Sequence, residues 1–181
     1  MVGIYIYQLK MKCKIIWFTG LSGAGKTTLS KLISKTLQNK KFKVKRIDGD
    51  LFRKKNNHKS FEKIEIIKNN LLIIKYIDKI KDNYDFIIVS VISPLKKTRN
   101  IAKKKFGRDY FEVFTKCNLK TLIDRDTKNL YEKAKKNIIK NLIGFNSKIK
   151  YERTSYKKIV VNTANETTKE SSKKILKKII K

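Results

Sequence analysis

The stretch Gly20-Leu21-Ser22-Gly23-Ala24-Gly25-Lys26-Thr27 decides the fold that we predict for this chain. It matches G-x-x-x-x-G-K-[ST], the Walker A phosphate-binding loop, at every fixed position. Its glycines let backbone N–H groups turn toward an anionic phosphate, and the helix that follows adds the positive end of its dipole. We therefore expect residues 20–27, together with Thr28, to bind the phosphates of ATP.

A strand pattern and a helix pattern flank this loop. The apolar run 15–18 predicts a strand, and apolar residues recur with helical spacing between 29 and 37. Strand, glycine loop and helix in this order are the arrangement that phosphate binding needs. We expect Lys26 to reach the β- and γ-phosphates and the Thr27 hydroxyl to hold Mg²⁺.

Strand and helix patterns alternate along the chain. The run Phe86-Ile87-Ile88-Val89 is typical of a parallel strand buried on both faces. The alternation predicts an α/β fold of the P-loop NTPase and kinase type, with a five-stranded parallel sheet, helices on both faces and a basic lid. The expected strands are 14–19, 43–47, 85–91, 110–116 and 157–162, and the expected helices are 26–39, 60–80, 95–105, 119–125, 130–141 and 166–180.

The length of 181 residues suits one domain. We expect a single P-loop kinase domain over residues 14–181 and an N-terminal extension over residues 1–13. The polar, Lys-rich segment from about 127 to 150 is typical of a lid over an active site. Because no apolar run reaches the roughly 18 residues that a membrane span needs, we expect no membrane partner.

The formal net charge of +31 raises the question of a nucleic-acid partner. The 46 basic residues are 40 Lys and only 6 Arg, spread over almost every predicted helix. A dedicated nucleic-acid surface would be richer in Arg and interleaved with aromatic residues, so we expect none. A nucleic-acid-stimulated ATPase is the alternative from another class, and it predicts a basic cluster on one face and a steep salt dependence.

Two cysteines, Cys13 and Cys117, border predicted strands. Their separation matches neither a metal site nor a redox pair. Cysteines without such a spacing are usually small buried apolar side chains in proteins of a reducing compartment, so we expect a cytoplasmic protein.

A second group of candidate residues, Asp48-Gly49-Asp50 followed by Arg53, falls at the end of the second predicted strand. Ligands of open parallel sheets bind outside the carboxyl ends of the strands. Carboxylates there serve Mg²⁺ or accept a proton from an attacking hydroxyl, and we expect Asp50 to join Thr27 at the metal. We expect Arg53 to clamp an anionic acceptor with two hydrogen bonds. The alternative is a turn with a capping Asp.

Two further groups follow later strands. Pro94, the only proline, ends the third predicted strand and opens a helix, which places Ser93 at the edge of the cleft. An ordinary N-cap serine is the alternative. Arg125 and Lys140 belong to the basic lid region, whose cations are expected to close over phosphates and stabilise their charge. A solvated basic helix is the alternative there.

Together these motifs resemble the adenylylsulfate kinase (APS kinase) family over about residues 14–152. The resemblance implies transfer of the γ-phosphate of ATP, with Mg²⁺, to the 3′-hydroxyl of adenylyl sulfate, a small-molecule nucleotide acceptor. Since the family often forms dimers, it also allows a homodimer. The matching segments are Gly20–Thr27, Asp48-Gly49-Asp50 with Arg53, Ile92-Ser93-Pro94, Phe111-Glu112-Val113-Phe114, 125–134, Ile139-Lys140-Asn141, Gly144, Ser147 and Tyr151-Glu152.

The resemblance also implies roles for single residues. Lys26 and Asp50 become catalytic, with Asp50 activating the hydroxyl, and Arg125 belongs to the ATP side. Ser93 becomes either a phosphoserine intermediate, as assigned in some members, or a hydrogen-bond partner of the acceptor. The implied acceptor-binding residues are Asp48, Arg53, Lys63, Ile92, Ser93, Lys140 and Leu142.

The acceptor side departs from the family pattern. Where the family carries Asp-Arg-x-x-Asn, this chain has Glu62-Lys63-Ile64-Glu65-Ile66, which lacks the guanidinium fork and the amide. Leu142 stands where the lid of the family has an aromatic residue that stacks on the acceptor base, a contact worth roughly 1–3 kcal/mol. A kinase of another nucleotide-type acceptor, such as a cytidine diphosphoramidate in capsule biosynthesis, is therefore the alternative.

Overall fold

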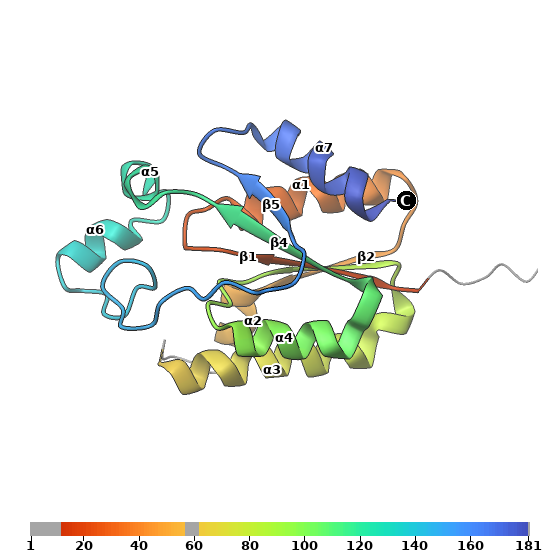
Figure 1. Cartoon of the computed structure of the whole chain (residues 1–181), viewed down its shortest axis with the longest axis horizontal. Helices are drawn as coiled ribbons and strands as arrows, with labels where there is room; N and C mark the ends of the chain where they lie inside the picture. Colours follow the sequence, from red (N-terminus) through yellow and green to blue (C-terminus); the bar gives the residue numbers. More distant parts are fainter. Residues whose placement is uncertain (1–11, 57–61, 181) are drawn as a thin grey trace, which may run out of the picture.

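The computed structural model describes residues 12–56 and 62–180 of the chain. Residues 1–11 of the expected N-terminal extension, and the first two residues of the expected helix 60–80, lie outside the described residues. Figure 1 shows one sheet between two layers of helices. Helices α1 (Lys26–Asn39) and α7 (Thr168–Ile179) cover one face, and α2 (Gly49–Lys55), α3 (Lys63–Ile80) and α4 (Lys96–Phe106) cover the other.

The sheet has five strands in the order β2-β3-β1-β4-β5, and every pair is parallel. The predicted α/β fold of the P-loop kinase type is therefore confirmed. The strands are β1 (Lys14–Thr19), β2 (Val44–Asp48), β3 (Phe86–Ser90), β4 (Tyr110–Lys116) and β5 (Ile159–Asn162).

The central strand β1 supplies both cores. Side chains alternate along a strand, so Ile15 and Trp17 pack in the core beneath α3 and α4, whereas Ile16 and Phe18 pack in the core beneath α1 and α7. All four are at most 1% exposed. This burial on both faces fixes the strand and hence the position of the loop that leaves its carboxyl end.

Most predicted elements agree with the structure to within one or two residues, and the strand 110–116 agrees fully. The expected helix 130–141 is wrong in its length, because α6 spans only Leu130–Lys135. Asn137, at a φ of 55°, adopts the left-handed conformation that ends a helix. The Ile138 N–H donates to the carbonyl of Lys133 and the Asn137 N–H to that of Ala134, which satisfies the last carbonyls.

Three short elements complete the chain. Helix α5 (Leu119–Arg125) agrees with its prediction, and two 3₁₀ turns, Lys81–Asn83 and Gly107–Asp109, precede β3 and β4. Helix α2 was not expected from the sequence. It begins where Asp48 accepts hydrogen bonds from the N–H groups of Asp50 and Leu51, so this aspartate caps a helix at the end of a strand.

The predicted lid, about residues 127–150, packs against the phosphate loop. Its residues Tyr131, Ala134 and Leu142 form an apolar cluster with Ala24 of the loop and Leu122 of α5. In Figure 1 this region, with α5 and α6, extends beyond the carboxyl end of β4. Within the described residues there is no helix that is long and apolar enough to cross a membrane.

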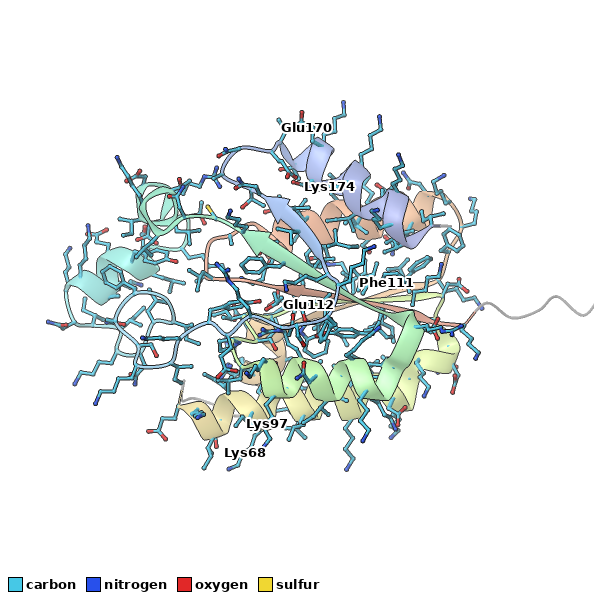
Figure 2. All side chains as sticks on the ribbon, in the orientation of Figure 1. Lys68, Lys97, Phe111, Glu112, Glu170 and Lys174 are labelled. Carbon is cyan, nitrogen blue, oxygen red and sulfur yellow. The ribbon has the colours of Figure 1, made fainter. Side chains whose placement is uncertain are left out.

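An ion pair is buried between β4 and α4. Arg99 and Glu112 have side chains that are 0% and 1% exposed, and Arg99 Nε lies 3.3 Å from Glu112 Oε2. Figure 2 labels Glu112 on the α4 side of the sheet and Phe111 on the opposite side. The guanidinium also donates to the carbonyls of Ser93 and Glu152. This pair therefore ties the loop after β3 to the segment that returns from the lid.

Candidate active site

The phosphate loop occupies the turn between β1 and α1. Gly20, Gly23 and Gly25 have φ values of 137°, 75° and 80°, which L side chains rarely adopt. A Cβ on Gly20 would also lie 2.4 Å from Thr115 Oγ1 and 2.6 Å from the carbonyl oxygen of Thr115. Glycine is therefore required at this position by both conformation and space.

Lys26 begins α1 and is buried beneath the loop. Its ammonium donates to the carbonyls of Gly20 at 2.9 Å and Leu21 at 2.6 Å. Burial lowers the pKa of Lys26 to about 8, although the nearby Asp50 carboxylate acts to raise it. A phosphate bound in the loop would restore the charged form by replacing the lost solvation.

The second strand brings two carboxylates to the same edge of the sheet. Asp48 ends β2, and its Oδ2 accepts a 3.4 Å hydrogen bond from the Thr27 hydroxyl. Asp50 lies in the first turn of α2, and its Oδ2 pairs with the Lys128 ammonium at 3.0 Å. Asp48 therefore caps a helix, as the alternative interpretation expects, and also lies in the site.

These residues line one cleft of about 360 Å³ at the carboxyl ends of the strands. The phosphate-loop residues Ser22, Gly23, Gly25 and Lys26 line it, and so does Arg125. The side chains of Leu21 and Ala24, two residues predicted to bind the cofactor, pack in the apolar cluster around Tyr131. The other lining residues are Thr27, Thr28, Leu29, Asp48, Asp50, Ser90, Val91, Ile92, Thr127, Lys128, Thr163, Glu166, Thr167, Thr168 and Ser171.

A smaller pocket continues past Asp50. It has a volume of about 10 Å³ and is lined by Arg53, Ile92 and Ser93, among others, and it shares Asp50, Val91 and Ile92 with the main cleft. Burial lowers the pKa of Arg53 below its usual value. Ser93 is buried, and its φ of 43° places it in the left-handed region. The structure thus brings Arg53, Ile92 and Ser93 together around one pocket.

Three predicted acceptor residues line neither part of this cleft. Lys63 borders a separate surface hollow between α3 and α4. Lys140 is exposed in the lid, and Leu142 is 8% exposed because it packs in the cluster around Tyr131. In this conformation a side chain at position 142 stabilises the lid, and the sequence pattern alone does not reveal that role.

Some residues of the cleft were missed from the sequence. Lys128 was noted only as part of a basic segment, and its partner Asp50 is 78 positions away. Thr163 and Glu166 follow β5, so the rule that ligands bind beyond the carboxyl ends of strands was sufficient to find them. In the parts of the chain that the structure describes, there is no group of three or more His, Cys, Asp or Glu side chains that could hold a metal ion.

The fold and the cleft define the class of P-loop kinases, which transfer a phosphoryl group from a nucleotide to an acceptor. Kinases of this fold include the shikimate kinase of Aquifex aeolicus, which superposes with a TM-score of 0.55 at 21% identity over 92% of this chain and 96% of that one.

Within this class the chain belongs to the adenylylsulphate kinase family, whose model matches residues 12–162. The probable adenylyl-sulfate kinase of Archaeoglobus fulgidus is 35% identical over 150 residues, or 82% of this chain and 95% of that protein. The adenylyl-sulfate kinase of Clostridium acetobutylicum is 34% identical over 161 residues, or 88% and 80%. The APS kinase CysC of Mycobacterium tuberculosis, in complex with AMPPNP and APS, superposes with a TM-score of 0.86 at 27% identity, over 94% and 99%. The predicted resemblance is confirmed.

Proposed function

We propose that this protein transfers the γ-phosphate of ATP to the 3′-hydroxyl of adenylyl sulfate. One observation carries the proposal: the Asp50 carboxylate and the phosphate loop with Lys26 line the same cleft. A phosphate loop alone indicates a nucleotide, whereas a carboxylate facing it supplies a group that can take a proton from an acceptor hydroxyl. The relatives named above, and the structure with AMPPNP and APS, support this choice of donor and acceptor.

The phosphates of ATP are assigned to the loop. Backbone N–H groups of residues 22–27 surround them, and Lys26 leaves the carbonyls of Gly20 and Leu21 to pair with the β- and γ-phosphates. The base and ribose are assigned to the part of the cleft between Arg125 and Thr163. In the loop, the N–H groups and the Lys26 ammonium are fixed hydrogen-bond donors. They stabilise the negative charge that develops on the phosphates during phosphoryl transfer.

The oxygen atoms beside the loop fit Mg²⁺. Thr27 offers a hydroxyl and Asp48 a carboxylate 3.4 Å away, with Asp50 on the same cleft wall. Mg²⁺ takes few protein ligands and keeps water and phosphate oxygens, so a dedicated cluster of carboxylates is not needed. Thr27, Asp48 and Asp50 would hold the ion, which would offset the charge of the phosphates when bound.

The acceptor is assigned to the side of Asp50 and Arg53. Asp50 takes the proton of the 3′-hydroxyl while the 3′-oxygen of the acceptor forms a bond to the γ-phosphorus, and the bond from that phosphorus to ADP breaks. Lys128 holds the Asp50 carboxylate at 3.0 Å and so orients it. Arg53 would bind the anionic part of the acceptor. Direct transfer of this kind needs no phosphorylated Ser93.

The test is ADP release from ATP and Mg²⁺ with adenylyl sulfate as acceptor, compared with cytidine nucleotides and with RNA or DNA. Turnover with adenylyl sulfate supports the proposal. Absence of turnover with adenylyl sulfate refutes it, and turnover with a cytidine-based acceptor instead would establish the alternative substrate. Stimulation by nucleic acid would establish the ATPase alternative. Asp50→Asn should abolish turnover while ATP binding persists.

The other expectations remain proposals. They are a single domain over residues 14–181, a lid over about 127–150, a cytoplasmic location, a homodimer, and the absence of a dedicated nucleic-acid partner. Light scattering on the purified chain tests the homodimer directly.

A further inference from the structure

One carbonyl of the phosphate loop is held by a residue of the predicted lid. The hydroxyl of Tyr131 in α6 donates a buried hydrogen bond of 2.9 Å to the carbonyl oxygen of Ser22, 109 positions earlier in the chain. Both residues are buried. Other loop carbonyls accept hydrogen bonds from side chains that line the cleft: Gly20 and Leu21 from Lys26, and Ala24 from Thr163. The Ser22 carbonyl is thus the point at which the lid holds the loop.

This hydrogen bond fixes the direction of one peptide group. The carbonyl of Ser22 and the N–H of Gly23 belong to the same planar trans peptide, so they point in opposite directions. Tyr131 packs in the apolar cluster with Ala24 and Leu142, whereas Ser22 and Gly23 line the cleft. A carbonyl that points to Tyr131 therefore turns the Gly23 N–H toward the cleft, where a phosphate oxygen would accept it.

The same peptide is the central one of a tight turn. The Ala24 N–H donates to the Leu21 carbonyl at 3.3 Å, which closes a four-residue turn with Ser22 and Gly23 at its centre. The φ of Gly23 is 75°, close to the value of a type II turn. Rotation of the central peptide converts type II into type I, and glycine permits both. Since a type I turn would point the Gly23 N–H away from the cleft, the hydrogen bond of Tyr131 selects the turn that can bind a phosphate.

The predicted lid holds Tyr131 in place against the loop. Asp126 accepts hydrogen bonds from three N–H groups in the first turn of α6, that of Tyr131 among them at 3.1 Å. The ring of Tyr131 meets that of Phe145 edge-on, with 5.8 Å between the ring centroids. A Cβ on Gly144 would lie 2.6 Å from a methyl group of Leu21, so the backbone of the lid also closely approaches the loop there. The hydroxyl of Tyr131 is therefore presented to the loop by contacts that the lid makes without a ligand.

We propose that Tyr131 is a positioning residue for the donor: its hydroxyl holds the Ser22 carbonyl and thereby aims the Gly23 N–H at a phosphate of ATP. The proposal rests on the proposed function, since it places ATP in the phosphate loop, but it does not depend on the acceptor. It gives the predicted lid a role in donor binding, in addition to the Lys128 contact with Asp50.

The experiment measures the Kd of ATP with Mg²⁺ by calorimetry in Tyr131→Phe of the full chain. The substitution keeps the ring and removes the hydroxyl, so the turn is no longer held in its binding conformation. The Kd should rise about five- to tenfold, because one hydrogen bond that selects this conformation is lost. The KM for ATP should rise by the same factor, whereas the kcat and the KM for adenylyl sulfate should stay within about twofold of the wild-type values.

The matched control is Tyr156→Phe. It also removes a tyrosine hydroxyl that donates inside the protein, here to Glu112 Oε2 at 2.5 Å and not to the phosphate loop. It should lower the free energy of unfolding but leave the Kd of ATP unchanged. An unchanged Kd in Tyr131→Phe, or an equal rise of the Kd in Tyr156→Phe, overturns the proposal.

A double-mutant cycle with Asp126→Asn separates positioning from stability. Asp126→Asn removes one of the two carboxylate oxygens that cap α6, so Tyr131 is held less firmly while its hydroxyl remains. It should raise the Kd of ATP in the wild-type background and much less in the Tyr131→Phe background, because both residues act through the same hydrogen bond. Additive effects overturn the proposal. If Tyr131→Phe does not fold, Asp126→Asn decides, and an unchanged Kd in that variant overturns the proposal.

Failure of the proposed function is distinguishable, because the binding of ATP is measured without an acceptor. A wild-type protein that binds ATP but does not turn over adenylyl sulfate refutes the proposed function, and the Kd values of the variants still decide the role of Tyr131. A wild-type protein that does not bind ATP refutes both.

Discussion

Neutralising Glu112 by Glu112→Gln should destabilise the protein and loosen the acceptor side of the site. Glu112 is the only carboxylate paired with Arg99 among the described ion pairs, and both side chains are at most 1% exposed. It also accepts hydrogen bonds from Thr154 at 3.2 Å and Tyr156 at 2.5 Å. The substitution keeps the size of the side chain but leaves the Arg99 charge buried without its counter-charge.

The expected magnitude follows from that burial. Breaking a buried ion pair by removing one partner costs about 3–5 kcal/mol. For a chain of this length, 1 kcal/mol corresponds to roughly 2–4 °C in Tm, so the Tm should fall by about 6–20 °C. Since Arg99 donates to the carbonyl of Ser93, the KM for the acceptor should rise while the KM for ATP stays near its wild-type value.

Urea unfolding and steady-state kinetics measure both effects. The matched control is Asp78→Asn, which removes a carboxylate that pairs with Lys81 at 2.6 Å and Lys105 at 2.7 Å on the surface. An exposed pair of this kind is worth about 1 kcal/mol or less. A loss of stability in Glu112→Gln no greater than that in Asp78→Asn would refute the reasoning.

Three more predictions concern the cleft. Burial lowers the pKa of Lys26 to about 8, so the free protein loses the positive charge of this lysine as the pH rises through that value. Calorimetry should therefore find weaker ATP binding at pH 9 than at pH 7, and equal affinities would contradict this. Gly20→Ala should lower stability by about 2–6 kcal/mol through the strain of its positive φ and the clash with Thr115. Gly107→Ala has the same kind of strain but its Cβ would meet nothing within 4 Å, so it should cost only about 1–3 kcal/mol; similar urea midpoints would argue against the clash. Lys128→Met should lower kcat about 10²-fold by releasing the Asp50 carboxylate, with little change in Tm because the pair is exposed; an unchanged kcat would remove Lys128 from the site.

The phosphate loop could be predicted because its chemistry is local. Its glycines and Lys26 are close in sequence, and the flanking strand and helix are marked by strong apolar patterns. The position of Asp48 and Asp50 followed from one rule, that ligands lie beyond the carboxyl ends of parallel strands. The same rule extended to β5 finds Thr163.

Other features depend on contacts between distant parts of the chain. Asp48-Gly49-Asp50 predicts a turn, and only the cap geometry shows that a helix begins there. The pairing of Lys128 with Asp50 depends on how the lid folds back. Helix α6 ends early, and Asn137, just beyond its end, adopts the left-handed conformation. The chain then changes direction and Leu142 packs in the apolar cluster around Tyr131, a position that no periodic sequence pattern predicts.

The most direct test of the central claim is the structure of the reaction product. The purified protein is incubated with ATP, Mg²⁺ and adenylyl sulfate, and the product is identified by phosphorus NMR and mass spectrometry. The account predicts one new phosphoester on the 3′-oxygen of adenylyl sulfate, formed in equal amount with ADP. ATP hydrolysis without a new phosphoester, or a phosphoester at any other position, would contradict it.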